Sequence, residues 1–211
     1  HAFGVEDESG SILKYGNLSV LSFHATKVFN TFEGGAIVCK DLKLKKRIDQ
    51  VKNFGKASET DFDQIGFNAK MNEFSSVLGL LNLKYIDADI KKRRIIDKLY
   101  REALENVTGV NVLPKSKLVK NNYSYFPIFI DNEYPLTRDQ LYFKLQDHGI
   151  NGRRYFYPLI TDLTIFGKST KNNKFDLSVA RNVTQKVICL PIFSDMDVNT
   201  INEIENLIKS S

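Results

Sequence analysis

The longest regular pattern in the chain is helical and runs from about Asn72 to Asn106. Apolar residues recur along it at the spacing that places side chains on one face of an α-helix. That apolar face consists of Val77, Leu81, Tyr85, Ala88, Ile95, Leu99 and Ala103. A segment of this length predicts either two consecutive helices or one kinked helix in the middle of the fold.

Short strand patterns alternate with helical patterns on both sides of this segment. Apolar runs bounded by turn residues predict strands, and Asp41, the pair Thr137 and Gln140, and Gly149 stand where helix caps are expected. The expected strands are 19–23, 36–39, 110–113, 125–130, 150–156 and 187–190, the expected helices are 41–51, 137–149, 176–185 and 199–209, and the expected loops are 53–71 and 161–175. Strands alternating with helices favour an α/β fold.

A change of texture after Gly109 is the candidate domain boundary. Beyond this residue, short strands alternate with helices more tightly than before it. We therefore expect two parts, residues 1–108 and residues 109–211, the second being a small α+β domain in which about three strands carry packed helices.

The chain is basic, with a net charge of +5 and a pI of about 9.0. Its basic clusters, Lys43–Arg47 and Lys91–Arg94, fall in helical segments without interleaved aromatic residues. We interpret them as solvated helix faces and expect no nucleic-acid site. An excess of positive charge also suits an anionic substrate.

Neither membrane insertion nor secretion is predicted. No apolar run approaches the roughly 20 residues that cross a bilayer, and residues 1–7 have neither a basic start nor a long apolar stretch. Cys39 and Cys189 each stand in an apolar run, which is typical of buried thiols. No disulfide framework is visible, so we expect a reducing cytoplasm.

The segment from Ser22 to Gly35 has the strongest chemical pattern. A strand candidate delivers Ser22, a single lysine follows at Lys27, and the pair Gly34-Gly35 lets the backbone approach a neighbour closely. A hydroxyl can hold a phosphate, and a lysine amine that loses its proton can form a Schiff base. From spacing alone, a solvent-facing lysine in a loop is the simpler interpretation.

This segment resembles the cofactor-lysine motif of the DegT/DnrJ/EryC1/StrS family of sugar aminotransferases. The family motif is Ser-Phe-x-x-x-Lys followed by Gly-Gly, and it is matched here by Ser22, Phe23, Lys27, Glu33, Gly34 and Gly35. The resemblance implies that Lys27 carries pyridoxal 5′-phosphate (PLP) as a Schiff base and acts as general base and acid, and that Ser22 binds the cofactor phosphate. It also implies PLP fold type I, with residues 1–108 as part of a large domain whose mixed sheet is flanked by helices.

Residues 65–73 resemble a second family pattern, Gly-x-Asn-x-(Arg or Lys)-Met-x-Glu. In the family its Asn reaches across a dimer interface to the cofactor phosphate of the other subunit. The resemblance assigns that role to Asn68 and the basic, substrate-binding position to Lys70, and both side chains are suitable donors to phosphate oxygens. The alternative is the first turn of a helix with an Asn cap.

Residues 149–159 resemble the family segment that approaches the sugar. Arg153 or Arg154 could meet a carboxylate or a diphosphate, and Tyr155 or Tyr157 could contact a sugar. Of the two arginines we assign Arg154 to the substrate site, with both tyrosines. The alternative is ordinary strand aromatics beside surface arginines.

The first residues resemble the end of a further family motif, Asp-x-x-(His or Gln)-Ala/Ser. His1 then takes the position that contacts the phenolic oxygen of the cofactor. The Asp that keeps the pyridine nitrogen protonated would stand three residues before His1, and this sequence does not contain it. We therefore expect a C-terminal portion of a longer enzyme that does not transaminate efficiently by itself.

The resemblance implies transfer of an amino group, with glutamate as the expected donor, to a nucleotide-linked keto-sugar in deoxyamino-sugar and cell-surface polysaccharide synthesis. A homodimer with shared active sites is expected. The motif forms look most like members that aminate carbon 3 of a dTDP-linked 6-deoxyhexose, although amination at carbon 4 uses the same framework.

Other functions are weaker. The dehydratase branch of the family has His at the cofactor lysine, so Lys27 argues against it. His1, His24 and His148 lack metal-ligand spacing, and no metal site is expected. His24 is interpreted as a packed or strand-end residue. The rival from another class is a non-catalytic remnant that dimerises or binds a sugar nucleotide.

Overall fold

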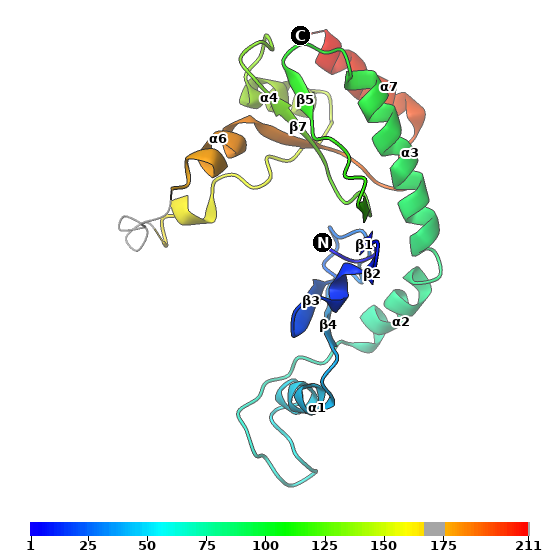
Figure 1. Cartoon of the computed structure of the whole chain (residues 1–211), viewed down its shortest axis with the longest axis vertical. Helices are drawn as coiled ribbons and strands as arrows, with labels where there is room; N and C mark the ends of the chain where they lie inside the picture. The colour runs from blue at the N-terminus through cyan, green and yellow to red at the C-terminus, as the bar shows by residue number, and fades with distance from the viewer. Residues whose placement is uncertain (167–175, 211) are drawn as a thin grey trace. The chain divides into compact units, whose positions relative to one another are not determined.

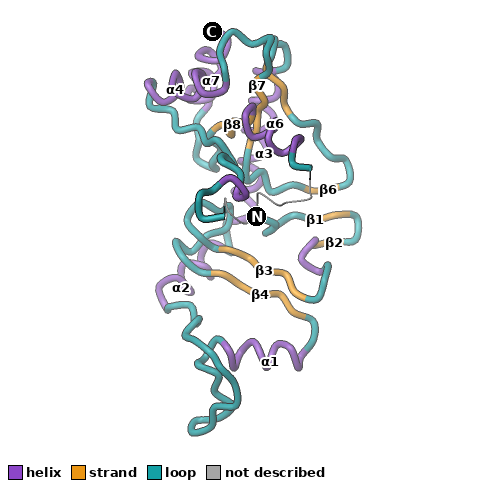
Figure 2. The backbone as a smooth tube through the Cα atoms, turned by 90° about the vertical axis from the view of Figure 1, so that its left-hand side faces the viewer, coloured by secondary structure: helices purple, strands orange, loops and turns teal. Residues whose placement is uncertain are grey.

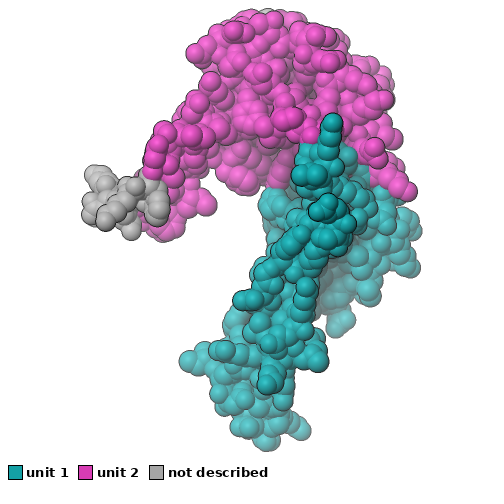
Figure 3. Space-filling view, in the orientation of Figure 1, with its two compact units in different colours: residues 1–90, 116–124 teal, residues 91–115, 125–211 magenta. Residues whose placement is uncertain are grey.

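The computed structural model describes residues 1–166 and 176–210 and groups the chain into two compact units. Unit 1 comprises residues 1–90 and 116–124, and unit 2 comprises residues 91–115 and 125–211 (Figure 3). The described residues include no helix that is long and apolar enough to cross a membrane. The domain division into residues 1–108 and 109–211 remains a prediction.

Unit 1 contains two small antiparallel sheets, one of order β2-β1-β6 and one of β3 and β4 (Figure 2). Its elements are β1 (Glu6–Asp7), β2 (Gly10–Ser11), the 3₁₀ turn η1 (Ile12–Lys14), β3 (Leu18–Ser22), β4 (Gly35–Cys39), α1 (Leu42–Val51), α2 (Glu73–Asn82), the start of α3 (Ile86–Leu104) and β6 (Val119–Lys120). The strands predicted at 19–23 and 36–39 are confirmed. The two-residue strands β1, β2 and β6 are too short to leave a period in the sequence.

Side-chain caps set the starts of the two helices that lie wholly in unit 1. The carboxylate of Asp41 accepts from the backbone N–H groups of Lys43 and Leu44 at the start of α1. The side chain of Asn72 accepts from Ser75 N at the start of α2, at 2.9 Å. Capping of this kind satisfies N–H groups that have no partner within the helix. Between α1 and α2, residues 53–71 form the predicted loop. The β-pairing described within it consists of isolated bridges.

The long helical pattern is two helices, α2 and α3, joined near Tyr85 (Figure 1). The apolar residues of this pattern do not form one buried face, because Val77, Tyr85 and Ile95 are 55%, 62% and 61% exposed. The buried hydrophobic side chains of these helices are Ile86, Ile90, Ile96, Tyr100 and Leu104. Apolar residues occupy more than one face of these helices, so periodicity predicts the helices without selecting the face that packs.

The described part of unit 2 contains one antiparallel sheet of order β5-β7-β8. Its elements are the rest of α3, β5 (Val110–Val112), β7 (Phe126–Ile130), α4 (Arg138–Asp147), the 3₁₀ turn η2 (Ile160–Asp162), α6 (Ser178–Lys186), β8 (Val187–Leu190) and α7 (Val198–Lys209). The capping box between Thr137 and Gln140 is present, and Gly149 has a positive φ of 76° just after α4. Residues 167–175 of the predicted loop 161–175 lie outside the described residues.

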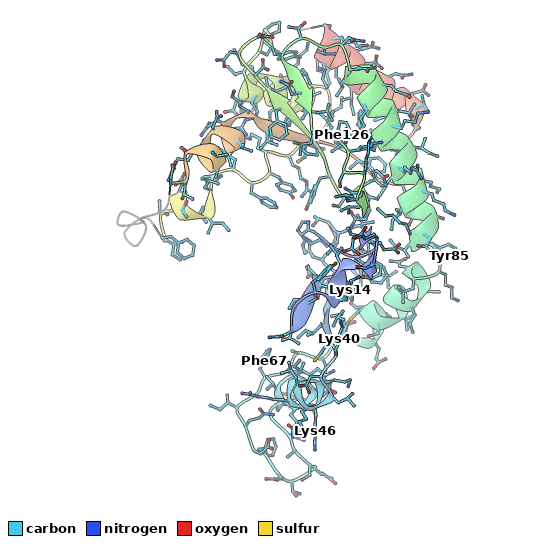
Figure 4. The ribbon with its side chains drawn as sticks, viewed as in Figure 1. Lys14, Lys40, Lys46, Phe67, Tyr85 and Phe126 are labelled. Carbon is cyan, nitrogen blue, oxygen red and sulfur yellow. The ribbon has the colours of Figure 1, made fainter. Side chains whose placement is uncertain are left out.

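A single core holds unit 2 together. Side chains from α3, α4 and α7 pack with the sheet, and the ring centroids of Tyr100 and Phe126 lie 4.9 Å apart. Phe126 is labelled in Figure 4. Tyr100 is fully buried and donates its hydroxyl to Pro191 O at 2.9 Å. Each large apolar side chain buried in this way stabilises the fold by about 1.5–3 kcal/mol. This core therefore holds the helices of unit 2 against its sheet.

The strand predicted at 150–156 is wrong. Within this segment only Arg153 pairs with β8, through an isolated bridge in which Arg153 N donates to Cys189 O and Cys189 N donates to Arg153 O. Tyr157 N then donates to Arg154 O at 2.9 Å, which closes a turn. The backbone therefore leaves the edge of β8 after one residue pair.

Candidate active site

Lys27 lies in the loop that joins β3 to β4. Two backbone bonds close the base of this loop: Phe23 N donates to Gly34 O and Thr31 N donates to Phe23 O, each at 2.9 Å. Within the loop, Lys27 N donates to His24 O at 2.9 Å. The lysine is thus carried by a folded loop in which several backbone groups are paired.

Three aromatic rings support the loop. Phe3 stacks on Phe29 with ring centroids 4.3 Å apart, and Phe23 stands edge-on to both rings at 6.2 and 4.8 Å. The buried side chains of Ile86 and Ile90 complete this cluster. Aromatic packing of this kind restrains the loop, and it connects the first residues of the chain to the lysine segment.

The predicted close approach at Gly34-Gly35 is confirmed, and the neighbour is the chain itself. A Cβ on Gly35 would lie 2.7 Å from Leu21 O, and one on Gly34, which has φ +148°, would lie 2.7 Å from Oγ1 of Thr31. Thr31 is fully buried and donates its hydroxyl to Glu33 O at 2.8 Å. Gly34 therefore leaves room for Thr31, and Gly35 leaves room for the backbone of β3.

The side chain of Lys27 meets that of His1. Nζ of Lys27 lies 2.7 Å from Nε2 of His1. The side-chain amide of Asn122, a residue that is 2% exposed, donates to His1 O and to Phe3 O at 2.8 Å each. Sequence reasoning missed Asn122, because its partners stand about 120 positions away in the chain and no local spacing marks it.

Ser22 and His24 are close neighbours of Lys27 in the chain. Ser22 ends β3, is exposed, and its Oγ accepts from His24 N at 3.4 Å. Nδ1 of His24 lies 2.9 Å from Oγ1 of Thr26, and its Nε2 lies 3.6 Å from Oε1 of Glu33. His24 is thus paired within the loop, whereas the Ser22 hydroxyl is accessible. The end of β3 and the β3–β4 loop therefore present the amine of Lys27, the imidazole of His24 and the hydroxyl of Ser22.

Asn68 and Lys70 lie in the loop before α2 and share one neighbour, Asn53. Nζ of Lys70 donates to Oδ1 of Asn53 at 2.8 Å and lies 4.5 Å from the ring centroid of Phe54, while Asn68 forms a backbone bridge with Asn53. Both residues are exposed. The helix cap considered as an alternative is Asn72 and not Asn68.

The predicted substrate residues of unit 2 are brought together. Arg154, Tyr155 and Tyr157 line a cavity of about 360 Å³. Nη1 of Arg154 donates to Oδ1 of Asp139 at 2.9 Å. Asp139 was missed in the sequence because it stands on α4, where an Asp in the first turn is ordinarily interpreted as helix stabilisation.

Solved structures with the same fold include proteins that are named as sugar aminotransferases. DesI, solved in the presence of its TDP-sugar product, has a TM-score of 0.91 and 30% identity, covering 100% of this chain and 53% of that chain. A protein of Streptococcus pneumoniae solved in a PLP form has a TM-score of 0.85 and 21% identity, covering 100% and 55%. The expected α/β architecture of PLP fold type I is thereby confirmed.

The chain belongs to the DegT/DnrJ/EryC1/StrS aminotransferase family, whose profile it matches over residues 1–209. A relative that is 44% identical over 212 residues is a dTDP-4-amino-4,6-dideoxy-D-glucose transaminase of Shigella dysenteriae. That match covers 97% of this chain and 57% of the relative. The chain thus spans little more than half the length of this relative.

Proposed function

We propose that the protein containing this chain is a PLP-dependent aminotransferase that places an amino group on carbon 4 of a dTDP-linked 6-deoxy keto-sugar. The observation that carries the proposal is the 2.7 Å approach of Lys27 Nζ to His1 Nε2 in the loop that matches the cofactor-lysine motif. The name of the Shigella relative supports a dTDP-sugar and favours carbon 4 over the carbon 3 suggested by the motif forms.

The residues around Lys27 fit PLP by their chemistry. An amine can bond to an aldehyde carbon, an imidazole can hydrogen-bond to a phenolic oxygen, and the exposed hydroxyl of Ser22 can donate to a phosphate. When bound, PLP supplies an electron sink for the negative charge that develops beside the amino group. His1 already lies within hydrogen-bond distance of the lysine.

Each residue of the site then has a distinct role. Lys27 holds the cofactor covalently and, with Nζ, takes and returns the proton that moves during transamination. His1 Nε2 orients the site, and Ser22 holds the phosphate. Asn122 and the three phenylalanine rings keep these groups in place, because a site is productive only when its supporting shell is rigid.

The remaining predicted residues are assigned to substrate and to a second subunit. We assign Asn68 to the cofactor phosphate and Lys70 to the substrate of a partner copy in a homodimer. The exposure of both residues supports this assignment. In the predicted small domain, 109–211, Arg154, Tyr155 and Tyr157 bind the sugar nucleotide, and glutamate is the amino donor.

Reductive trapping tests the proposal. The protein expressed from its complete gene is incubated with PLP, reduced with borohydride, digested and searched for a pyridoxyl-lysine peptide by mass spectrometry. We expect the adduct on the peptide that contains Lys27 and its loss in Lys27→Ala. Lys40→Ala, at an exposed lysine just after β4 (Figure 4), is the matched control and keeps the adduct.

Turnover gives a second measurement. Lys27→Arg keeps the positive charge but cannot move the proton in the same way, so kcat should fall at least ~10²-fold. An unmodified Lys27 peptide, or labelling scattered over surface lysines, would overturn the proposal and support a non-catalytic remnant.

A further inference from the structure

One carboxylate in unit 2 lies between two guanidinium groups. Oδ1 of Asp139 is 2.7 Å from Nε of Arg138 and accepts from Nη1 of Arg154 at 2.9 Å. Arg138 and Asp139 begin α4, whereas Arg154 belongs to the irregular segment that follows this helix. The carboxylate therefore ties that segment to the helix.

Contacts other than the one with Asp139 hold the side chain of Arg138 in place. It is 3% exposed, and its Nη1 donates to the carbonyl oxygens of Thr184 and Val187 at 2.9 and 3.2 Å. Its Cζ also lies 4.7 Å from the ring centroid of Tyr157. A buried cation held at three points gives the neighbouring carboxylate a fixed orientation.

Two contacts hold the side chain of Arg154, and some of its N–H groups remain available to a ligand. Asp139 takes its Nη1, and its Cζ lies 4.3 Å from the ring centroid of Tyr142, also on α4. Within the described part of the chain, Nε and Nη2 of Arg154 donate no hydrogen bond to the protein, and its side chain is 29% exposed. A guanidinium presents its donors as a planar fork that matches two oxygens of a phosphate.

The charge around Arg154 is not balanced. Arg138, Asp139 and Arg154 together have a net charge of +1, and Arg153 adds a further cation beside the cavity. The 360 Å³ cavity has no Asp or Glu among its described lining residues, which are Tyr142, Gly152, Arg153, Arg154, Tyr155, Phe156, Tyr157, Pro158 and Ile160. This lining suits an anion with a flat or apolar group attached.

We propose that Arg154 binds the diphosphate of the nucleotide-linked sugar in this cavity, and that Asp139 is the positioning residue that presents Arg154 to it. The substrate class rests on the proposed function. The cavity recognises an oxyanion. Such a group is present in the diphosphate of the sugar nucleotide and also in the carboxylate of the amino donor. Asp139 acts through Arg154 and does not itself touch the substrate.

Binding of dTDP and of thymidine tests the proposal without turnover. In the protein expressed from its complete gene, Asp139→Asn should weaken calorimetric binding of dTDP about ten-fold, the effect of losing one charge-assisted hydrogen bond. Binding of thymidine, which lacks phosphate, should be unchanged. Asp147→Asn, at the exposed end of the same helix, is the matched control and should alter neither.

Kinetics separate the two sources of the anion. Asp139→Asn should raise KM for the sugar nucleotide by the same factor while kcat and the KM for glutamate stay unchanged, which is the pattern for lost ground-state binding. Arg154→Lys keeps the positive charge and loses the planar set of N–H donors, so it should likewise raise KM for the sugar nucleotide without changing kcat. It replaces Asp139→Asn as the test if that variant does not fold.

Three results would overturn the proposal. They are equal loss of dTDP and thymidine binding, a rise confined to the KM for glutamate, and identical behaviour of Asp139→Asn and Asp147→Asn. The proposed function fails by a different result, the absence of a pyridoxyl adduct on Lys27. The two failures are therefore distinguishable.

Discussion

Nζ of Lys27 and Nε2 of His1 lie 2.7 Å apart, although 26 positions separate the residues in the chain. Which of the two nitrogen atoms donates the hydrogen bond depends on the tautomer of the His1 ring. Two contacts support this approach: the ring of Phe3 stacks on Phe29 of the β3–β4 loop, and the amide of Asn122 holds the backbone of His1 and Phe3.

This contact makes His1 a test of cofactor binding. His1→Ala removes the imidazole, and PLP affinity, measured by absorbance titration of the protein from its complete gene, should fall about ten-fold, as for one lost polar contact. His1→Gln keeps a hydrogen-bonding group and should lose less, because the family motif has either His or Gln there. Equal losses in the two variants would contradict a hydrogen-bonding role.

Asn122 should be important for stability. Asn122→Ala leaves the carbonyl groups of His1 and Phe3 without a buried donor, so the free energy of unfolding should fall by about 2–3 kcal/mol. The neighbouring Asn121 is exposed, and its side chain accepts from Tyr123 N. Asn121→Ala should therefore cost about 1 kcal/mol or less. Urea unfolding of both variants checks the difference, and similar values would show that Asn122 is dispensable.

Gly34 should tolerate no side chain. Gly34→Ala places Cβ 2.7 Å from Thr31 Oγ1 at a φ that L-residues rarely adopt. Gly16→Ala has a positive φ of 74° but meets nothing closer than 3.7 Å. The loss of unfolding free energy in Gly34→Ala should exceed that in Gly16→Ala by about 1–3 kcal/mol, the usual cost of overpacking. Thermal denaturation gives the comparison, and equal losses would mean that the loop relaxes around Thr31.

The two cysteines should differ in reactivity. Burial raises the pKa of the Cys189 thiol to about 11, so the group stays protonated at pH 8 and is a poor nucleophile. Cys39 is only half-buried, contrary to the expectation of two buried thiols, and its Sγ donates to Asp41 O at 3.2 Å. We expect iodoacetamide to label Cys39 first, as followed by mass spectrometry.

The unfolded protein is the control for that experiment, because both thiols should then react at similar rates. The sign for stability follows from the same shift. Only the unfolded state ionises Cys189 between the ordinary thiol pKa and about pH 11, so its contribution to stability falls as pH rises through this range. Faster labelling of Cys189 than of Cys39 in the folded protein would contradict its burial.

Local patterns were reliable where the interactions are local. The caps at Asp41 and Thr137 depend on residues two or three positions apart, and the structure confirms them. The segment 150–156 failed because its partner strand, β8, begins some thirty positions later. Alternation alone could not show that the pairing ends at Arg153.

The sequence by itself determined the family, the lysine motif and a long helical segment in the middle of the chain, because motifs and helical periods are written in neighbouring residues. Only the tertiary structure decided which helix face is buried, that Asn122 holds His1 beside Lys27, and that Asp139 joins Arg138 to Arg154. These are contacts between side chains on different elements, and no local spacing specifies which of them the packing of the core will bring together.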